Sequence, residues 1–136
     1  MRDYIFRGKR VDTGELVEGC LIHQGDHYLI LQDESKLHPM DVPYINELGC
    51  IDGYATPVVP DSVGQYTGMK DKNGRKIFEG DIINIEYDTT TVENCVVTYI
   101  GACFYGNTDF DSWELDYYVD IEVIGNVFEN ADLLEG

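Results

Sequence analysis

Apolar and polar residues alternate along much of the chain with a period of two, which is typical of strands that bury one face. The alternation is clearest at residues 83–87, where Ile83, Ile85 and Tyr87 are separated by polar side chains. Other runs rich in β-branched, aromatic and aliphatic residues predict strands at residues 4–7, 16–22, 28–32, 89–100 and 115–124. The pattern therefore predicts a mainly β protein. If helices contribute, the fold class is α+β at most.

Short polar segments that contain glycine separate these runs and predict tight turns. Residues 23–27 carry a Gly-Asp pair between two strand-like runs, which predicts a β-hairpin. Asn73-Gly74 predicts a type I′ turn, because both central residues of that turn must accept a positive φ. Residues 79–81 predict a further turn. Many short strands at this spacing are typical of a small sandwich or barrel.

Two segments break the strand pattern. Residues 33–62 contain all four prolines of the chain, namely Pro39, Pro43, Pro57 and Pro60. Since proline lacks an N–H and has a fixed φ, we expect a connector with extended pieces and one helical turn at 44–48, not central strands. Residues 101–112 are rich in Gly, Asn and Asp and predict a loop. Near the end of the chain, Asn130 is expected to cap one helical turn whose leucines pack back on the fold.

The connector suggests a division into two lobes. Residues 1–60 would form an N-terminal β-hairpin lobe with the proline-bearing connector. Residues 61–136 would form a barrel-like unit. The alternative is that both parts belong to one intertwined domain.

The charge of the chain narrows its expected partners. The 136 residues include 26 acidic and nine basic side chains, for a formal net charge of -17. All nine basic residues lie at or before Lys76, so residues 77–136 hold 14 acidic residues and no Lys or Arg. A field of one sign repels nucleic acid and anionic membranes and attracts basic protein surfaces, although it also serves solubility alone. Nucleic acid is therefore not the expected partner.

The sequence also suggests a compartment. No run approaches the roughly 18 apolar residues of a membrane span, and the N-terminus lacks the apolar segment of a signal peptide. We therefore expect a cytoplasmic protein without a membrane partner, whose four cysteines are free and mostly buried thiols. Cys20 and Cys95 in particular stand among apolar neighbours that suit a small core residue.

Motifs that carry chemistry are weak in this chain. Cys20, His23 and His27, with His38 further on, have the ligand types of a zinc site, but they flank a predicted turn and no fourth ligand has motif spacing. Residues 107–112 begin like an EF-hand loop, yet the Gly and Glu required at its sixth and twelfth positions are missing. No nucleophile motif such as G-x-S-x-G occurs. We therefore predict no catalytic, cofactor-binding or metal-binding residue, and a protein that is not an enzyme.

Three segments of the chain resemble one known family. Residues 63–82 contain V-G-Q-Y-T-G, D-K-N-G and I-F-E-G-D-I, residues 6–9 read F-R-G-K, and residues 122–130 read E-V-I-G-N-V-F-E-N. In this order, and over nearly the whole chain, they closely resemble the YopX-like family. The resemblance implies a small SH3-type β-roll or barrel, here with an N-terminal strand lobe and short helical turns. It also implies a phage or prophage origin in a Gram-positive host and residence in the host cytoplasm. It implies no activity, because the family is described as uncharacterised.

Aromatic and acidic residues interleave between positions 101 and 124. The candidate interaction surface consists of Phe110, Asp111, Trp113, Glu114, Asp116 and Tyr118. Aromatic side chains can anchor an interface, and carboxylates accelerate association with a basic partner. The preferred hypothesis is a non-enzymatic protein-interaction module that binds a protein partner or itself through this face. Two further interpretations stay open: an acidic DNA mimic, and aromatics that simply belong to the core.

A basic cluster on the predicted hairpin at residues 66–78 supports a different function. Its candidate residues are Tyr66, Lys70, Lys72, Arg75 and Lys76. Basic side chains beside aromatic rings can bind single-stranded nucleic acid or RNA. The alternative is a charged hairpin tip that protects a sheet edge. We favour the latter, because the net field of the protein opposes nucleic acid.

Overall fold

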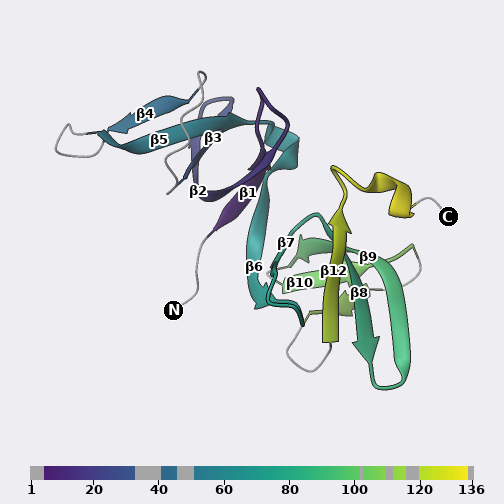
Figure 1. Cartoon of the computed structure of the whole chain (residues 1–136). Coiled ribbons are helices and arrows are strands. Elements are labelled where there is room, and N and C mark those ends of the chain that lie inside the picture. The colour runs from purple at the N-terminus through teal and green to yellow at the C-terminus, as the bar shows by residue number, and fades with distance from the viewer. Residues whose placement is uncertain are drawn as a thin grey trace. The chain divides into compact units, whose positions relative to one another are not determined.

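The computed structural model describes residues 5–32, 41–45, 51–101, 103–109, 112–115 and 120–134 (Figure 1). In these residues the regular structure is antiparallel β-sheet with two short 3-10 turns, η1 (Pro60–Ser62) and η2 (Ala131–Leu134). The mainly β prediction is thus confirmed. No helix in the described part of the chain has the length and apolar character to cross a membrane. The chain divides into two compact units, Met1–Gln65 and Tyr66–Gly136.

The described strands of the first unit are β1 (Phe6–Lys9), β2 (Leu16–Gln24), β3 (His27–Leu31), β4 (Val42–Ile45) and β5 (Ile51–Val58). They pair in the order β4-β5-β3-β2-β1. The predicted hairpin is present, since Gln24 pairs with His27 across a turn in which Gly25 has a φ of 59°. After η1, β6 (Gly64–Lys70) pairs through its first residues with β1 and continues into the second unit.

A small buried centre holds the first unit together. Ile30, Ala55 and Val58 are at most 4% exposed. Gly8 of β1 permits close packing on them, because a Cβ atom there would lie 3.0 Å from the Cβ of Val58. An isolated bridge between Arg10 and Val58 also brings the end of β5 to the residue that follows β1.

The proline-rich connector contains more strand than predicted. Pro43 is tolerated because β4 is the edge strand of its sheet. Pro57 pairs with Leu29 of β3, while its carbonyl accepts a hydrogen bond from the N–H of Val11 on the other side. Because N–H and C=O of one residue point the same way in a strand, the missing N–H also faces away from β3. The prediction of no central strand is therefore wrong for β5. The helical turn predicted at 44–48 is strand as far as Ile45, and its other residues lie outside the described part.

The second unit contains, after β6, the described strands β7 (Lys76–Phe78), β8 (Asp81–Tyr87), β9 (Thr90–Ile100), β10 (Cys103–Asn107), β11 (Ser112–Glu114) and β12 (Asp120–Asn126). Five of them form a sheet in the order β11-β10-β9-β8-β12. One face of this sheet packs on a buried cluster, here called the core cluster, of Ile77, Ile83, Ile85, Cys95, Val97, Leu115, Ile121 and Val123. The period-two pattern thus identified Ile83 and Ile85 of β8 correctly as buried positions, whereas the side chain of Tyr87 is outside the described part.

The turn at residues 71–75 differs from the predicted type I′ turn. The N–H of Gly74 donates to the carbonyl of Asp71 at 3.0 Å, and Gly74 has a φ of 82°. Asn73 does not have the positive φ that a type I′ turn demands of it. The three-residue loop between Asp71 and Arg75 is therefore a type I turn followed by a glycine bulge.

Three other expectations need correction. The segment 101–112 is not one loop, because it contains β10, where a Cβ on Gly106 would lie 2.8 Å from the Cδ1 of Ile85. Of the strand predicted at 115–124, Leu115 is not in a strand, residues 116–119 lie outside the described part, and residues 120–124 belong to β12. Finally, the described strands form open sheets and no closed barrel.

Candidate functional site

The aromatic part of the predicted basic hairpin is buried. Tyr66 and Phe78 are 5% and 1% exposed and pair across β6 and β7, with ring centroids 5.5 Å apart. Lys70 and Lys76 pair with each other at the other end of the same hairpin. Nucleic acid bases stack on exposed ring faces. The hairpin therefore presents cations without the stacking platform that such binding needs.

The turn of this hairpin is fastened to β12 through Asp71. Its buried carboxylate accepts hydrogen bonds, each 2.9 Å long, from the backbone N–H groups of Asn73, Arg75 and Val123. Burial alone would raise the pKa of Asp71, but these backbone donors, together with the nearby charge of Arg75, lower it below its ordinary value. The carboxylate thus joins both arms of the turn to an edge strand.

The basic side chains of the turn face the same strand. The backbone N–H of Lys72 donates to the carbonyl of Ile121 at 3.0 Å, and its Nζ lies 3.6 Å from Glu122. The guanidinium of Arg75 donates to the carbonyl of Val123 at 3.4 Å. The turn covers part of an otherwise open strand edge, as the protective interpretation of the hairpin expects.

The structure describes only part of the predicted acidic-aromatic surface. Outside the described residues lie Phe110, Asp111, Asp116 and Tyr118. Trp113 of β11 is half-buried and packs against the core cluster. Glu114, the next residue, is exposed and lies on the opposite face of the strand. The two described candidates therefore face different ways, and Trp113 belongs to the core side.

The opposite side of the five-stranded sheet, here called the outer face, is acidic. Ile83 and Ile85 point into the core cluster, so Glu86 points to the outer face. Asp120 of β12 is its direct cross-strand partner, and both side chains are exposed. Glu122 follows on the same face of β12. The sheet register thus gathers three carboxylates that lie far apart in the sequence.

Little positive charge offsets this arrangement. Lys72 pairs with Glu122, but both side chains are more than a third exposed, at 48% and 38%. Neither Glu86 nor Asp120 forms an ion pair in the described part of the chain. Like charges directly opposite each other in a sheet are destabilising. The alternation of acidic with apolar residues in β12 could have placed Asp120 and Glu122 on an exposed face, whereas their pairing with β8 was not readable from the sequence.

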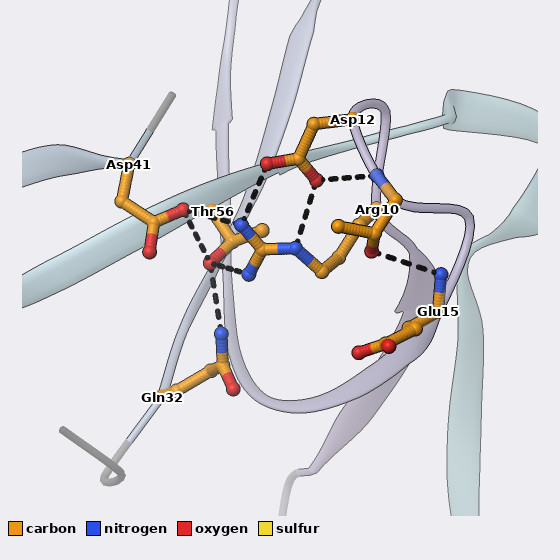
Figure 2. A network of polar contacts seen from close by, with 7 residues as sticks. Arg10, Asp12, Glu15, Gln32, Asp41 and Thr56 are labelled. Carbon is orange, nitrogen blue, oxygen red and sulfur yellow. Dashed lines mark hydrogen bonds and ion pairs between the residues drawn. The ribbon is translucent and has the colours of Figure 1, made fainter. Parts of the chain in front are cut away.

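A second polar cluster lies in the first unit (Figure 2). The guanidinium of Arg10 donates to both carboxylate oxygens of Asp12 at 2.9 and 3.0 Å and to Asp41 at 2.8 Å. It also donates to the hydroxyl of Thr56 at 3.0 Å, which accepts a further bond from Gln32 at 2.8 Å. Arg10 and Asp41 side chains are each 2% exposed. These groups satisfy one another, so the cluster joins β5 to the residues around it and offers no open site.

The cysteine and histidine residues show no common site in the described part of the chain. Cys20 is exposed, contrary to the expectation that it belongs to the core. His23 stacks on Tyr28 with ring centroids 4.1 Å apart and contacts the carbonyl of Gly25 at 2.8 Å. His38 lies outside the described residues. Within them, no group of three His, Cys, Asp or Glu side chains is arranged to hold a metal ion. Burial raises the pKa of the Cys95 thiol to about 11.

Comparison with known proteins decides the family. The family model described as YopX protein matches residues 12–135. The chain belongs to the YopX protein family. No curated protein matches it.

The motifs that resemble the YopX family are turn anchors in this structure. Asp81, 1% exposed, accepts a hydrogen bond from the N–H of Phe78 at 2.8 Å. Gly80 has a φ of 89°, and its N–H donates to the carbonyl of Val97. Asn126 accepts hydrogen bonds through its side-chain oxygen from the backbone N–H groups that open the next turn. These YopX motif residues stabilise the second unit and do not themselves form a reactive site.

Asn130, predicted to cap a helical turn, has a different role. Its side-chain oxygen accepts a hydrogen bond from the N–H of Asn126 at 3.2 Å, so it fastens the end of β12. Its backbone carbonyl, just before η2, accepts a hydrogen bond from the N–H of Leu133 within η2. The helical turn is present, but the side chain of Asn130 binds the last residue of β12 instead of capping the turn.

Proposed function

We propose that this YopX protein is a non-enzymatic interaction module whose acidic outer face binds a basic protein surface. One observation carries the proposal: Glu86 and Asp120 are exposed, directly opposite each other, and unpaired by any cation of the described chain. Lysine or arginine side chains of a partner would offset the repulsion between them. The proposed binding surface is acidic, like the acidic-aromatic surface predicted from the sequence. Its central carboxylates, however, belong to β8 and β12.

The field around this face favours such a partner. Residues 77–136 contain no Lys or Arg, so the strands of the outer face contribute negative charge only. A field of one sign raises the association rate with a basic surface and is screened by salt. Binding should therefore weaken as the ionic strength rises. A partner that normally binds DNA would make the protein a DNA mimic, which is a special form of the same proposal.

We also propose the biological setting that the family resemblance implies. The protein would be encoded by a phage or prophage and act in the cytoplasm of the bacterial host. Its partner would then be a basic protein of that compartment. This setting rests on the family resemblance of the sequence alone.

Paired charge variants test the proposal. The full-length protein and the double variant Glu86→Gln/Asp120→Asn are immobilised and used to capture proteins from bacterial lysate at low and moderate salt. The matched control is Asp26→Asn/Asp61→Asn, which removes the same charge from exposed positions of the first unit. We expect a basic protein to be retained at low salt by the wild type and the control and lost from the outer-face variant.

Two results would contradict the proposal. One is capture of no salt-sensitive basic protein by the wild type. The other is equal loss of binding in both double variants, since net charge alone would then explain it. Duplex DNA added to the captured complex distinguishes the DNA-mimic form, because it should displace the protein only if the partner uses its DNA-binding site.

A further inference from the structure

A groove of about 470 Å³ lies in the second unit between β9, β10 and η2. Its volume is within the range of sites for small molecules and side chains. The residues that line it are Glu93, Asn94, Val96, Asn107, Thr108, Asp109, Leu133 and Leu134. Val96 and Asn107 are direct cross-strand partners, which places the groove at one end of the outer face.

The groove combines an apolar part with hydrogen-bond acceptors. Val96, Leu133 and Leu134 supply the apolar surface. Glu93 and Asp109 are exposed carboxylates on its lining. Since residues 77–136 contain no Lys or Arg, the segment that builds the groove supplies no positive charge to it. The complementary ligand has a cationic head with several donors and an aliphatic stem.

The polar groups of the groove are held in place by the strands. The side-chain amide of Asn107 donates to the hydroxyl of Thr98, while its Oδ1 is buried and accepts no hydrogen bond from the described residues. Asn94 has a φ of 56°, and its N–H donates to the side-chain oxygen of Asn84 at 3.1 Å. The Oδ1 of Asn107 lies beneath the surface, so the acceptors that the groove presents to a ligand are the exposed carboxylates of Glu93 and Asp109.

We infer that this groove binds an arginine side chain presented by an extended segment of the basic partner. The inference rests on the proposed function and names the place where that partner is anchored. A guanidinium presents five N–H donors in a planar fork, which suits the two exposed carboxylates of Glu93 and Asp109 on the lining of the groove. The methylene groups of arginine pack on Leu133 and Leu134. A lysine ammonium carries its three donors on one nitrogen atom, so it is less suited than a guanidinium to bind the two carboxylates at the same time.

Titration with small ligands tests this inference on the full-length protein. Nα-acetyl-arginine amide, the lysine analogue and the neutral citrulline analogue are added separately while backbone amide resonances are followed by NMR. We expect saturable shifts, strongest for arginine and absent for citrulline, at residues 93–96 and 107–109. Asp109→Asn should weaken arginine binding about fivefold, as expected for one exposed charge contact. The matched control Glu129→Gln, at another exposed acidic position, should leave it unchanged.

Three outcomes of the titration would overturn the inference. Equal shifts with citrulline, shifts confined to the Glu86 and Asp120 region, or equal effects of Asp109→Asn and Glu129→Gln would show that the groove is not an arginine site. The proposed function would survive these results if lysate capture still depends on Glu86 and Asp120. Arginine binding in the groove with no captured basic protein would instead support the groove and reject the proposed function.

Discussion

Asp12 is bound through both carboxylate oxygens by Arg10, and this pair makes the stability of the first unit depend on pH. The hydrogen bond from Arg10 lowers the pKa of Asp12 from its ordinary 3.8 to about 2. A carboxylate with a depressed folded pKa stabilises the fold fully above its unfolded pKa and loses this contribution as the pH falls through the folded value. The contribution of Asp12 should therefore be complete above about pH 5 and disappear between pH 3.8 and about 2.

The variant Asp12→Asn tests this expectation. At pH 7 we expect a lower free energy of unfolding than in the wild type, measured by urea denaturation with far-UV circular dichroism. The difference should shrink as the pH is lowered to 2. Asp26→Asn, in the exposed turn before β3, serves as the control and should follow the wild type. A difference that stays constant from pH 7 to pH 2 would contradict the assigned role of the carboxylate charge.

Burial of single residues was predictable only in part. Cys20 and Cys95 both have apolar neighbours, so the sequence predicts the same burial for both side chains. Cys95 is fully buried in the core cluster, whereas Cys20 is exposed on β2. Successive side chains of a strand point to opposite faces, and only the pairing with other strands decides which face is covered.

At the scale of elements, the 71–75 turn depends on Asp71. Replacing Asp71 by Ala leaves the N–H groups of Asn73, Arg75 and Val123 without their acceptor, and the bond to Val123 is a buried one. We expect Asp71→Ala to lower the free energy of unfolding by about 3 kcal/mol, because the buried N–H of Val123 is costly when unsatisfied and two further bonds to a charged group are lost. Trp113 is the single tryptophan and packs on the core cluster, so its fluorescence reports unfolding of the second unit.

A neighbouring position provides the control for this prediction. Lys72 lies in the same turn, but its ion pair with Glu122 is solvent-exposed. Lys72→Ala should therefore change the free energy of unfolding by less than about 1 kcal/mol. Similar losses in both variants would mean that the Asp71 hydrogen bonds do not hold the turn to β12.

Elements with local signals were predictable, and elements defined by long-range contacts were not. The strands β2, β3, β8 and β9 were found because their alternation or their turns are encoded in neighbouring residues. β5 was missed because Pro57 is acceptable only where the strand needs no N–H on that side. β10 was missed because Gly106, a residue typical of loops, is needed there for contact with Ile85.

For the whole molecule, the distribution of charge was readable from the sequence but its arrangement was not. The lack of Lys and Arg after Lys76 placed any charge-driven function in the C-terminal half. The candidate site itself depends on the register that brings Glu86 opposite Asp120. It also depends on the 71–75 turn, whose Lys72 forms an ion pair with Glu122. Neither follows from local composition, because the pairing joins distant segments.

The same charge arrangement predicts how salt affects the isolated protein. Repulsion between Glu86 and Asp120 should make the variant Glu86→Gln/Asp120→Asn more stable than the wild type at low salt by about 0.5–1 kcal/mol. Raising NaCl from about 0.02 M to about 0.5 M should stabilise the wild type and narrow this difference, because exposed charges are screened. Urea denaturation followed by Trp113 fluorescence measures both effects.

Asp26→Asn/Asp61→Asn carries the same net charge and should show a smaller gain in stability, since Asp26 and Asp61 are not paired with each other across strands. Equal gains in the two variants would attribute the effect to net charge. A larger gain in the outer-face variant, together with its loss of partner binding, would mean that these carboxylates are kept at the expense of stability because a basic partner requires them.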